Sequence, residues 1–221
     1  MCDVRTYVKQ FEKDVCYAEA KGSETGRIVF VGNSGFTRWD PMYGMKAMED
    51  QIRKKDGSPA VWNHGIGGST TEDQLYYYDR LIKNYRPRAL VLLSHGNNKS
   101  YGYSPEEAIF LLTRLCAYAR TDFPGIWLYV CTSRPTYAGR TNPAWLEYAR
   151  KYDQLLEEYA AGHADVTVLR FSDEPRLFED GHAGDYTKAR KDLCIEDMIH
   201  SNQAGFDILA DFFTKALDEL L

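Results

Sequence analysis

Residues 29–39, VFVGNSGFTRW, run from an apolar segment directly into a glycine-bounded break. A short apolar run of this kind is typical of a strand buried in a parallel sheet. The break leaves Ser34 just beyond the end of the expected strand. A serine there is most often a turn or helix-capping residue, but an exposed nucleophile would occupy the same place. The rest of the sequence must distinguish these two interpretations.

Apolar runs alternate with segments of helical periodicity along the whole chain. The expected strands are residues 27–31, 60–63, 88–94, 126–132 and 166–171. The expected helices are residues 4–20, 42–54, 71–84, 105–121, 143–161 and 203–220. Such an alternation forms right-handed βαβ units. We therefore expect an α/β fold, a three-layer α/β/α flavodoxin-like sandwich whose five-stranded parallel sheet has the order 2-1-3-4-5.

The composition favours a globular protein that binds a small molecule. Of the 221 residues, 44% are hydrophobic, which is ample for a packed core. We expect a single domain over residues 1–221, with an N-terminal helical part, 1–22, packed on the core. The formal net charge of −5 and the lack of a basic cluster argue against nucleic acid or an anionic membrane as partner. The composition is compatible with a homo-oligomer.

The cysteines and the N-terminal sequence indicate a reducing compartment. The five cysteines are odd in number and include no Cys-x-x-Cys pair, so free thiols fit better than disulfides or a structural zinc site. The first 22 residues carry charges every few positions and lack the apolar core of a signal peptide. If Met1 is the natural start, we expect a cytoplasmic protein.

Polar segments follow the expected strands, at the sheet edge where open α/β proteins bind ligands. They are GNS after the first strand, NHGIGGST (63–70) after the second, SHGNNKS (94–100) after the third, and DMIHSNQAGF (197–206) beyond the fifth. Taken singly, each is an ordinary turn or cap. The segment 63–70 lacks the lysine of a P-loop and the third glycine of a dinucleotide fingerprint. Position 36 is Phe, where a nucleophile elbow needs Gly.

Together and in this order, these segments resemble the sequence blocks of the SGNH (GDSL-type) hydrolases, a superfamily of esterases and lipases. The resemblance covers residues 27–213. Gly-Asn-Ser stands where the family has Gly-Asp-Ser, which implies that Ser34 is the nucleophile. The family's Asp-x-x-His matches Asp197 to His200, which implies the acid and the base. The resemblance thus implies a serine esterase that needs neither metal nor cofactor.

The same resemblance implies an oxyanion hole of three donors. These are the backbone N–H of Ser34, the backbone N–H of Gly68 in the glycine-rich turn, and one side-chain amide. Matching Gly-x-Asn to Gly96-Asn97-Asn98 makes Asn98, and not Asn97, that amide. Donors placed where negative charge develops are what a tetrahedral intermediate requires.

The chain departs from the family pattern at three positions. Asn33 replaces the first-block Asp, Lys99 stands where an Asp often follows the oxyanion Asn, and Ser201 stands where a Pro often follows the His. None of these changes removes a catalytic atom. Asn33 and Lys99 nevertheless raise the alternative of a domain that binds a ligand without catalysis.

Loop residues at the same edge are candidates for the pocket wall. Lys99, Tyr101, Arg134 and Arg140 are the expected substrate-binding residues, and the cations among them would favour a polar or anionic alcohol portion. His64 and His95 are as compatible with a structural role as with a place in the pocket. The polar stretch 172–196 is long for a simple connection, and we expect it to form a lid-like loop.

These features predict hydrolysis of a short-chain O-acyl ester. An acetylated carbohydrate or a similar small polar metabolite is the expected substrate class, because the loop 172–196 has too few apolar side chains to line a long acyl groove. A lysophospholipase or a thioesterase of the same fold is the alternative enzyme. The alternative that is not an enzyme is a member of the family that binds a ligand without catalysis.

Overall fold

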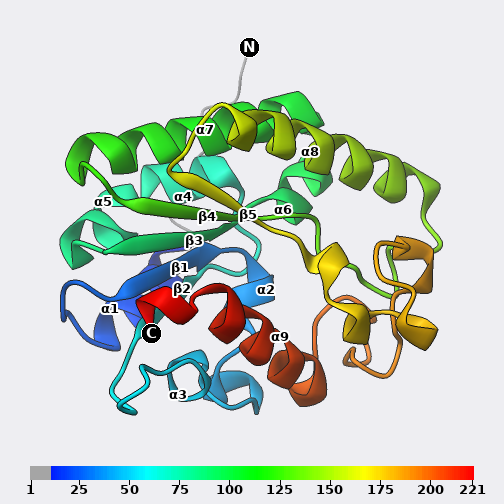
Figure 1. The fold of residues 1–221 in the computed structure, drawn as a ribbon, viewed down its shortest axis with the longest axis horizontal. Coiled ribbons are helices and arrows are strands. Elements are labelled where there is room, and N and C mark those ends of the chain that lie inside the picture. The colour runs from blue at the N-terminus through cyan, green and yellow to red at the C-terminus, as the bar shows by residue number, and fades with distance from the viewer. Residues whose placement is uncertain (1–10) are drawn as a thin grey trace.

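Five parallel strands form one sheet in the order β2-β1-β3-β4-β5 in the computed structural model, which describes residues 11–221 (Figure 1). The strands are β1 (Ile28–Gly32), β2 (Val61–Gly65), β3 (Ala89–Leu93), β4 (Trp127–Cys131) and β5 (Val166–Leu169). β1 lies between β2 and β3, with Gly32 in register with Gly65 of β2 and Leu93 of β3. The predicted α/β/α fold and strand order are confirmed.

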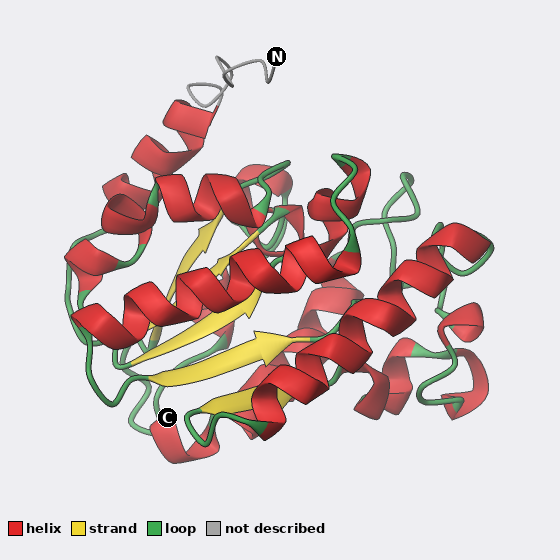
Figure 2. Ribbon diagram, turned by 90° about the horizontal axis from the view of Figure 1, so that it is seen from above, coloured by secondary structure: helices red, strands yellow, loops and turns green. Residues whose placement is uncertain are grey.

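One face of the sheet is covered by the helices that connect its central and outer strands. These are α4 (Thr71–Tyr76), α5 (Tyr78–Leu81), α7 (Pro105–Asp122) and α8 (Pro143–Ala161), and α1 (Glu12–Ala20) packs on the same core through Val15 and Ala18. The two long helices α7 and α8 lie across the strands (Figure 2). Each of the two begins with a side-chain N-cap and a proline in the first turn.

The other face is covered by short helices and by the C-terminal helix. They are α2 (Ser34–Thr37), α3 (Met48–Gln51) and α9 (Gln203–Ala216), while α6 (His95–Ser100) follows β3 at the sheet edge. Phe213 of α9 packs edge-on against Phe30 of β1 at 5.1 Å and against Phe36 of α2 at 5.9 Å. These ring contacts fix α2 against β1, because aromatic pairs in a close-packed core tolerate little displacement.

Several expected helices are shorter than predicted. The segment 42–54 contains only the 3₁₀ turn η2 (Pro41–Tyr43) and α3, because Gly44 takes a left-handed conformation between them with φ +76°. The segment 71–84 breaks into α4, α5 and η3 (Lys83–Tyr85), and the segment 203–220 into α9 and η8 (Asp218–Leu220). Residues 4–10 of the first expected helix lie outside the described residues.

The segment 172–196 folds as a series of short turns. They are η4 (Phe171–Asp173), η5 (Pro175–Leu177), η6 (Glu179–Gly181) and η7 (Tyr186–Lys188). Leu177 and Phe178 are buried in the core shared with α9, so part of this segment belongs to the packed body of the protein. Among the residues that the structure describes, no helix is both long and apolar enough to cross a membrane.

Candidate active site

Three side chains form a hydrogen-bonded row at the carboxyl edge of the sheet. His200 Nε2 lies 2.7 Å from Ser34 Oγ, and His200 Nδ1 lies 2.6 Å from Asp197 Oδ2. Ser34 is the first residue of α2, and Asp197 and His200 belong to the turn that precedes α9. A hydroxyl, an imidazole and a carboxylate in this order are the arrangement by which a base removes the hydroxyl proton and a carboxylate holds the base.

Asn33 and the glycines around it place Ser34. The Asn33 side chain caps α2 by accepting a hydrogen bond from the Gly35 N–H at 2.9 Å, which an Asp carboxylate could equally accept. β2 approaches the same helix so closely that a Cβ on Gly65 would lie 2.4 Å from the Thr37 nitrogen. The Asp-to-Asn departure from the family pattern therefore keeps the acceptor that shapes this turn.

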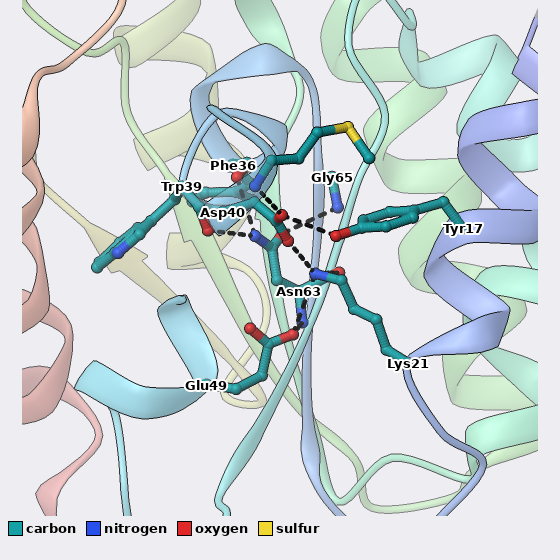
Figure 3. Close-up of polar contacts among 9 residues, drawn as sticks. Tyr17, Lys21, Phe36, Trp39, Asp40, Glu49, Asn63 and Gly65 are labelled. Carbon is teal, nitrogen blue, oxygen red and sulfur yellow. Dashed lines mark hydrogen bonds and ion pairs between the residues drawn. The ribbon is translucent and has the colours of Figure 1, made fainter. Parts of the chain in front are cut away.

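Asn63 of β2 forms hydrogen bonds at the C-terminal end of the helix that carries Ser34. Its Nδ2 donates to the carbonyls of Phe36 and Trp39, at 2.9 and 3.2 Å, and its Oδ1 accepts from the Gly65 N–H at 3.0 Å (Figure 3). Asn63 is 3% exposed, so these bonds satisfy groups that water does not reach. The amide thus joins the end of β2 to the residues that follow Ser34.

A buried charge network continues from this point to the N-terminal helix. Asp40 accepts hydrogen bonds from the Tyr17 hydroxyl at 2.8 Å and the Met42 N–H at 2.9 Å, and it pairs with Lys21 at 2.8 Å (Figure 3). Lys21 also pairs with Glu49 at 3.3 Å. Burial would raise the pKa of Asp40, but its bonds to Lys21, Met42 and Tyr17 hold that pKa below its ordinary value.

The Asp197 carboxylate organises the turn that carries His200. Its Oδ1 accepts the backbone N–H groups of Ile199 and His200, each at 2.9 Å, and Met198, which directly follows Asp197, has a left-handed backbone with φ +61°. Burial opposes ionisation, but these bonds and His200 lower the pKa of Asp197 to about 2. Burial also lowers the pKa of His200, although Asp197 opposes that change. A neutral imidazole beside an ionised carboxylate is the protonation state that a general base requires.

Arg134, from the loop after β4, holds the residues on either side of His200. Its Nη2 donates to the Ile199 carbonyl at 2.7 Å and its Nη1 to the Ser201 hydroxyl at 3.0 Å. Burial lowers the pKa of this guanidinium. Ser201, the third departure from the family pattern, thus serves as an acceptor for Arg134.

Two of the three side chains, Ser34 and His200, line a cavity of about 300 Å³. Its lining comes from the ends of β1 and β3, from α6, from the loop after β4, from the start of α8, and from Ile199 and His200. The lining residues are Asn33, Ser34, Gly35, Leu93, His95, Gly96, Asn97, Ser100, Arg134, Thr136, Ala138, Gly139, Asn142, Trp145, Ile199 and His200. A hollow of about 470 Å³ within residues 175–192 is larger but contains none of the three side chains.

The structure does not place the side chain of Asn98 in this cavity. Asn98 is completely buried, its Oδ1 accepts from the Thr71 N–H at 2.9 Å, and its Nδ2 donates to the Thr71 hydroxyl at 2.8 Å. Asn97 lines the cavity, and its Nδ2 donates to the Ser69 carbonyl at 2.9 Å. The pocket amide that we expected at Asn98 therefore belongs to Asn97, and Asn98 joins α6 to the start of α4.

The glycine-rich turn has the shape that its sequence predicts. The Ser69 N–H donates to the Ile66 carbonyl at 3.1 Å across the turn, and Gly68 has φ +82°, which a residue with a side chain rarely adopts. Gly68 is not among the residues that line the cavity, but its neighbour Ser69 is bonded to Asn97. The turn is thus held beside the cavity by α6.

Of the four expected substrate-binding residues, only Arg134 lines the cavity. Lys99 lies 6.0 Å from the Tyr148 ring, and Tyr101 is half exposed outside the cavity. Arg140 pairs with Glu179 at 2.5 Å and donates to the Ala189 carbonyl at 3.1 Å. These three side chains contact other parts of the protein or solvent, and their role in substrate binding stays a prediction.

The cavity wall also differs from the one expected. The segment 172–196 contributes no lining residue, and the wall comes instead from the loop after β4 and from the start of α8. Sequence reasoning missed Thr136, Asn142 and Trp145, whose only signal was their position after the fourth strand. The lid-like role of the segment 172–196 stays a prediction.

The two histidines left open by the sequence lie in different places. His64 is buried away from the cavity, with Nδ1 2.6 Å from the Leu81 carbonyl, and burial lowers its pKa to about 4. His95 lines the cavity, where its Nε2 accepts the Arg134 N–H at 3.3 Å. Within residues 11–221, no three His, Cys, Asp or Glu side chains gather as metal ligands.

Comparison with known proteins agrees with this geometry. Residues 30–208 match the model of the GDSL-like lipase/acylhydrolase family. A solved structure from Streptococcus pneumonia is 19% identical, with a TM-score of 0.72 over 97% of this chain and 94% of that one. A GDSL-like lipase from Bacteroides thetaiotaomicron is 15% identical, with a TM-score of 0.71 over 97% and 100% of the two chains. No curated protein sequence matches the chain.

The different surroundings of Asn97 and Asn98 predict different effects on stability. Asn98→Ala should lower the free energy of unfolding by about 1–3 kcal/mol for each buried Thr71 group that it leaves without a partner. Asn97→Ala removes one half-buried hydrogen bond and should cost about 1 kcal/mol or less. Denaturant unfolding of the two variants measures both values. A larger loss in Asn97→Ala would contradict the placement of these amides.

Proposed function

We propose that this protein cleaves short-chain O-acyl esters through an acyl-enzyme on Ser34. The chain belongs to the GDSL-like lipase/acylhydrolase family and is a hydrolase of carboxylic esters. The observation that carries this proposal is the unbroken row from Ser34 through His200 to Asp197, with distances of 2.7 and 2.6 Å, whose first two members line a cavity. The alternative of a domain that only binds a ligand gives no reason for a hydroxyl, an imidazole and a carboxylate in this order.

Each member of the row has one proposed task. Ser34 Oγ attacks the ester carbonyl while His200 Nε2 takes the hydroxyl proton, and a C–O bond forms to give a tetrahedral intermediate. The intermediate collapses by breaking the bond to the alcohol, which leaves with the proton from His200. Water then repeats the sequence on the acyl-enzyme and releases the acid and free Ser34. Asp197 stabilises the transient imidazolium and stays ionised, because its pKa is about 2.

The proposed oxyanion hole uses the backbone N–H groups of Ser34 and Gly68 and the side chain of Asn97. The Asn97 amide carries two N–H groups, and its hydrogen bond to the Ser69 carbonyl uses one of them. The second would donate to the developing oxyanion. Loss of one such donor typically costs about 10²–10³ in kcat, so we assign that effect to Asn97→Ala and not to Asn98→Ala.

A short acyl group fits the cavity better than a long chain does. Its volume of about 300 Å³ is at the lower end of small-molecule sites and must also hold the alcohol portion. Apolar lining comes from only a few side chains, among them Leu93, Trp145 and Ile199, and polar residues separate them. These features favour an acetyl ester of a carbohydrate or other small polar metabolite over a lysophospholipid or a long-chain thioester.

Replacement of the proposed nucleophile should abolish turnover without unfolding the protein. Ser34→Ala removes the attacking oxygen but only one half-buried hydroxyl from the packed structure. We expect a fluorophosphonate probe to label the wild type and not Ser34→Ala, and turnover of 4-nitrophenyl acetate to fall by at least about 10³. Equal labelling of both proteins would contradict the assignment. Absence of labelling in folded wild-type protein would favour the binding-only alternative.

The environment of His200 predicts the pH dependence. His200 must be neutral to accept the serine proton, and burial lowers its pKa below the ordinary value of 6.5. A lowered pKa keeps the imidazole neutral to a more acidic pH, so kcat/KM should be flat near pH 7 and fall only below about pH 6.5. A pH series with a neutral acetyl ester measures the midpoint. A midpoint above 7 would be incompatible with a buried, neutral base.

The acyl preference separates the proposed enzyme from its lipolytic alternatives. Each buried CH₂ contributes about 0.8 kcal/mol where an apolar groove is available to receive it. We expect kcat/KM for 4-nitrophenyl esters to fall from acetyl or butyryl to octanoyl. A steady rise up to eight carbons would support the lysophospholipase or thioesterase reading instead.

A further inference from the structure

We infer that the alcohol portion of the substrate carries an anionic group, such as a carboxylate, and that Arg134 binds it. This inference rests on the proposed function, because it names the substrate class of the same cavity. It is carried by the surroundings of one guanidinium, which is the only Arg, Lys, Asp or Glu side chain among the residues that line the cavity.

Arg134 has hydrogen-bonding capacity to spare. A guanidinium carries five N–H donors. The structure uses two of them, on the Ile199 carbonyl and the Ser201 hydroxyl, and the other three have no acceptor within residues 11–221. The Nε atom faces the nucleophile turn, since it would lie 3.8 Å from a Cβ built on Gly35. The free donors are thus available beside the reacting serine.

Arg134 also lacks a partner of opposite charge. Among the described residues, no carboxylate oxygen lies within 4.0 Å of its nitrogens, whereas Arg80, Arg120 and Arg140 each pair with an Asp or a Glu. The charge of Asp197 acts on Arg134 from farther away, but that carboxylate is already bound by His200 and two backbone N–H groups. A half-buried cation without a counterion is costly, and an anionic ligand would offset that cost.

A substrate anion bound to Arg134 would also affect the protonation of His200. The charged groups that act on the imidazole are Asp197, which favours its protonation, and Arg134 and Arg38, which oppose it. His200 must become an imidazolium during acylation, so both cations raise the energy of that step. A substrate anion on Arg134 would partly neutralise one of these cations and so favour the charged base when the ester is bound.

The other two candidate cations cannot take this role. Lys99 lies outside the cavity beside the Tyr148 ring, and Arg140 is paired with Glu179 at 2.5 Å. Arg140 is therefore a matched control for Arg134, because it comes from the same loop and carries the same charge but has its own counterion.

The test compares two esters that differ only in charge, 3-acetoxybenzoate and 3-acetoxybenzamide. At low salt and pH 7.5, we expect the wild type to prefer the carboxylate at least about tenfold in kcat/KM. Arg134→Gln keeps an N–H donor but removes the charge, and should bring the ratio near one. Arg134→Lys should restore part of the preference, and Arg140→Gln should leave it at the wild-type value. The ratio is insensitive to a general loss of activity from a displaced His200.

A binding measurement keeps the inference testable without turnover. We expect calorimetry on Ser34→Ala to show tighter binding of 3-hydroxybenzoate than of 3-hydroxybenzamide, and this difference to disappear in Ser34→Ala/Arg134→Gln. A wild-type ratio at or below one with equal binding, or a preference that survives Arg134→Gln, would overturn the inference. If the wild type hydrolyses no ester but still shows carboxylate binding that depends on Arg134, only the proposed function would be overturned.

Discussion

The hydrogen bond between Ser34 Oγ and His200 Nε2 is the contact on which the site depends, and it joins residues 166 positions apart in the chain. It forms only if the end of β1 and the turn before α9 reach the same sheet edge. The strand order supplies the edge, and Phe213 of α9 packs against Phe36 of α2, so the two elements cannot shift independently. Core packing between aromatic rings therefore sets the position of a polar contact at the surface.

The sheet could be predicted from the sequence because buried parallel strands are uninterrupted apolar runs. Ser34, Asp197 and His200 could be predicted as neighbours because polar segments follow those strands at one edge of the sheet. The sequence could not choose between Asn97 and Asn98. Consecutive residues of a helix point about 100° apart, so the direction of each amide depends on where α6 begins, and motif spacing does not give that position. The sequence also could not show that Leu177 and Phe178 of the segment 172–196 are buried in the core, because their burial depends on tertiary packing.

The departures from the family pattern have separate physical consequences. Asn33 keeps the acceptor that caps α2 but brings no charge, and Ser201 accepts a hydrogen bond from Arg134. Lys99 lies outside the cavity. The lining consequently includes no Asp or Glu side chain, and the electrostatic character of the cavity comes from Arg134 and from the imidazole. A carboxylate at position 33 would have given this guanidinium a neighbour of opposite sign.

The charge network of Lys21, Asp40 and Glu49 constrains how this protein can diverge. One ammonium group at the end of α1 balances two carboxylates, of which Asp40 is 3% exposed and lies six residues after Ser34. A neutral residue at position 21 would leave two uncompensated negative charges close to the helix that carries Ser34. Substitution there should be tolerated only when position 40 or 49 changes as well. The three positions should therefore covary among homologues, and the first described helix should be inherited with the hydrolase core as one unit.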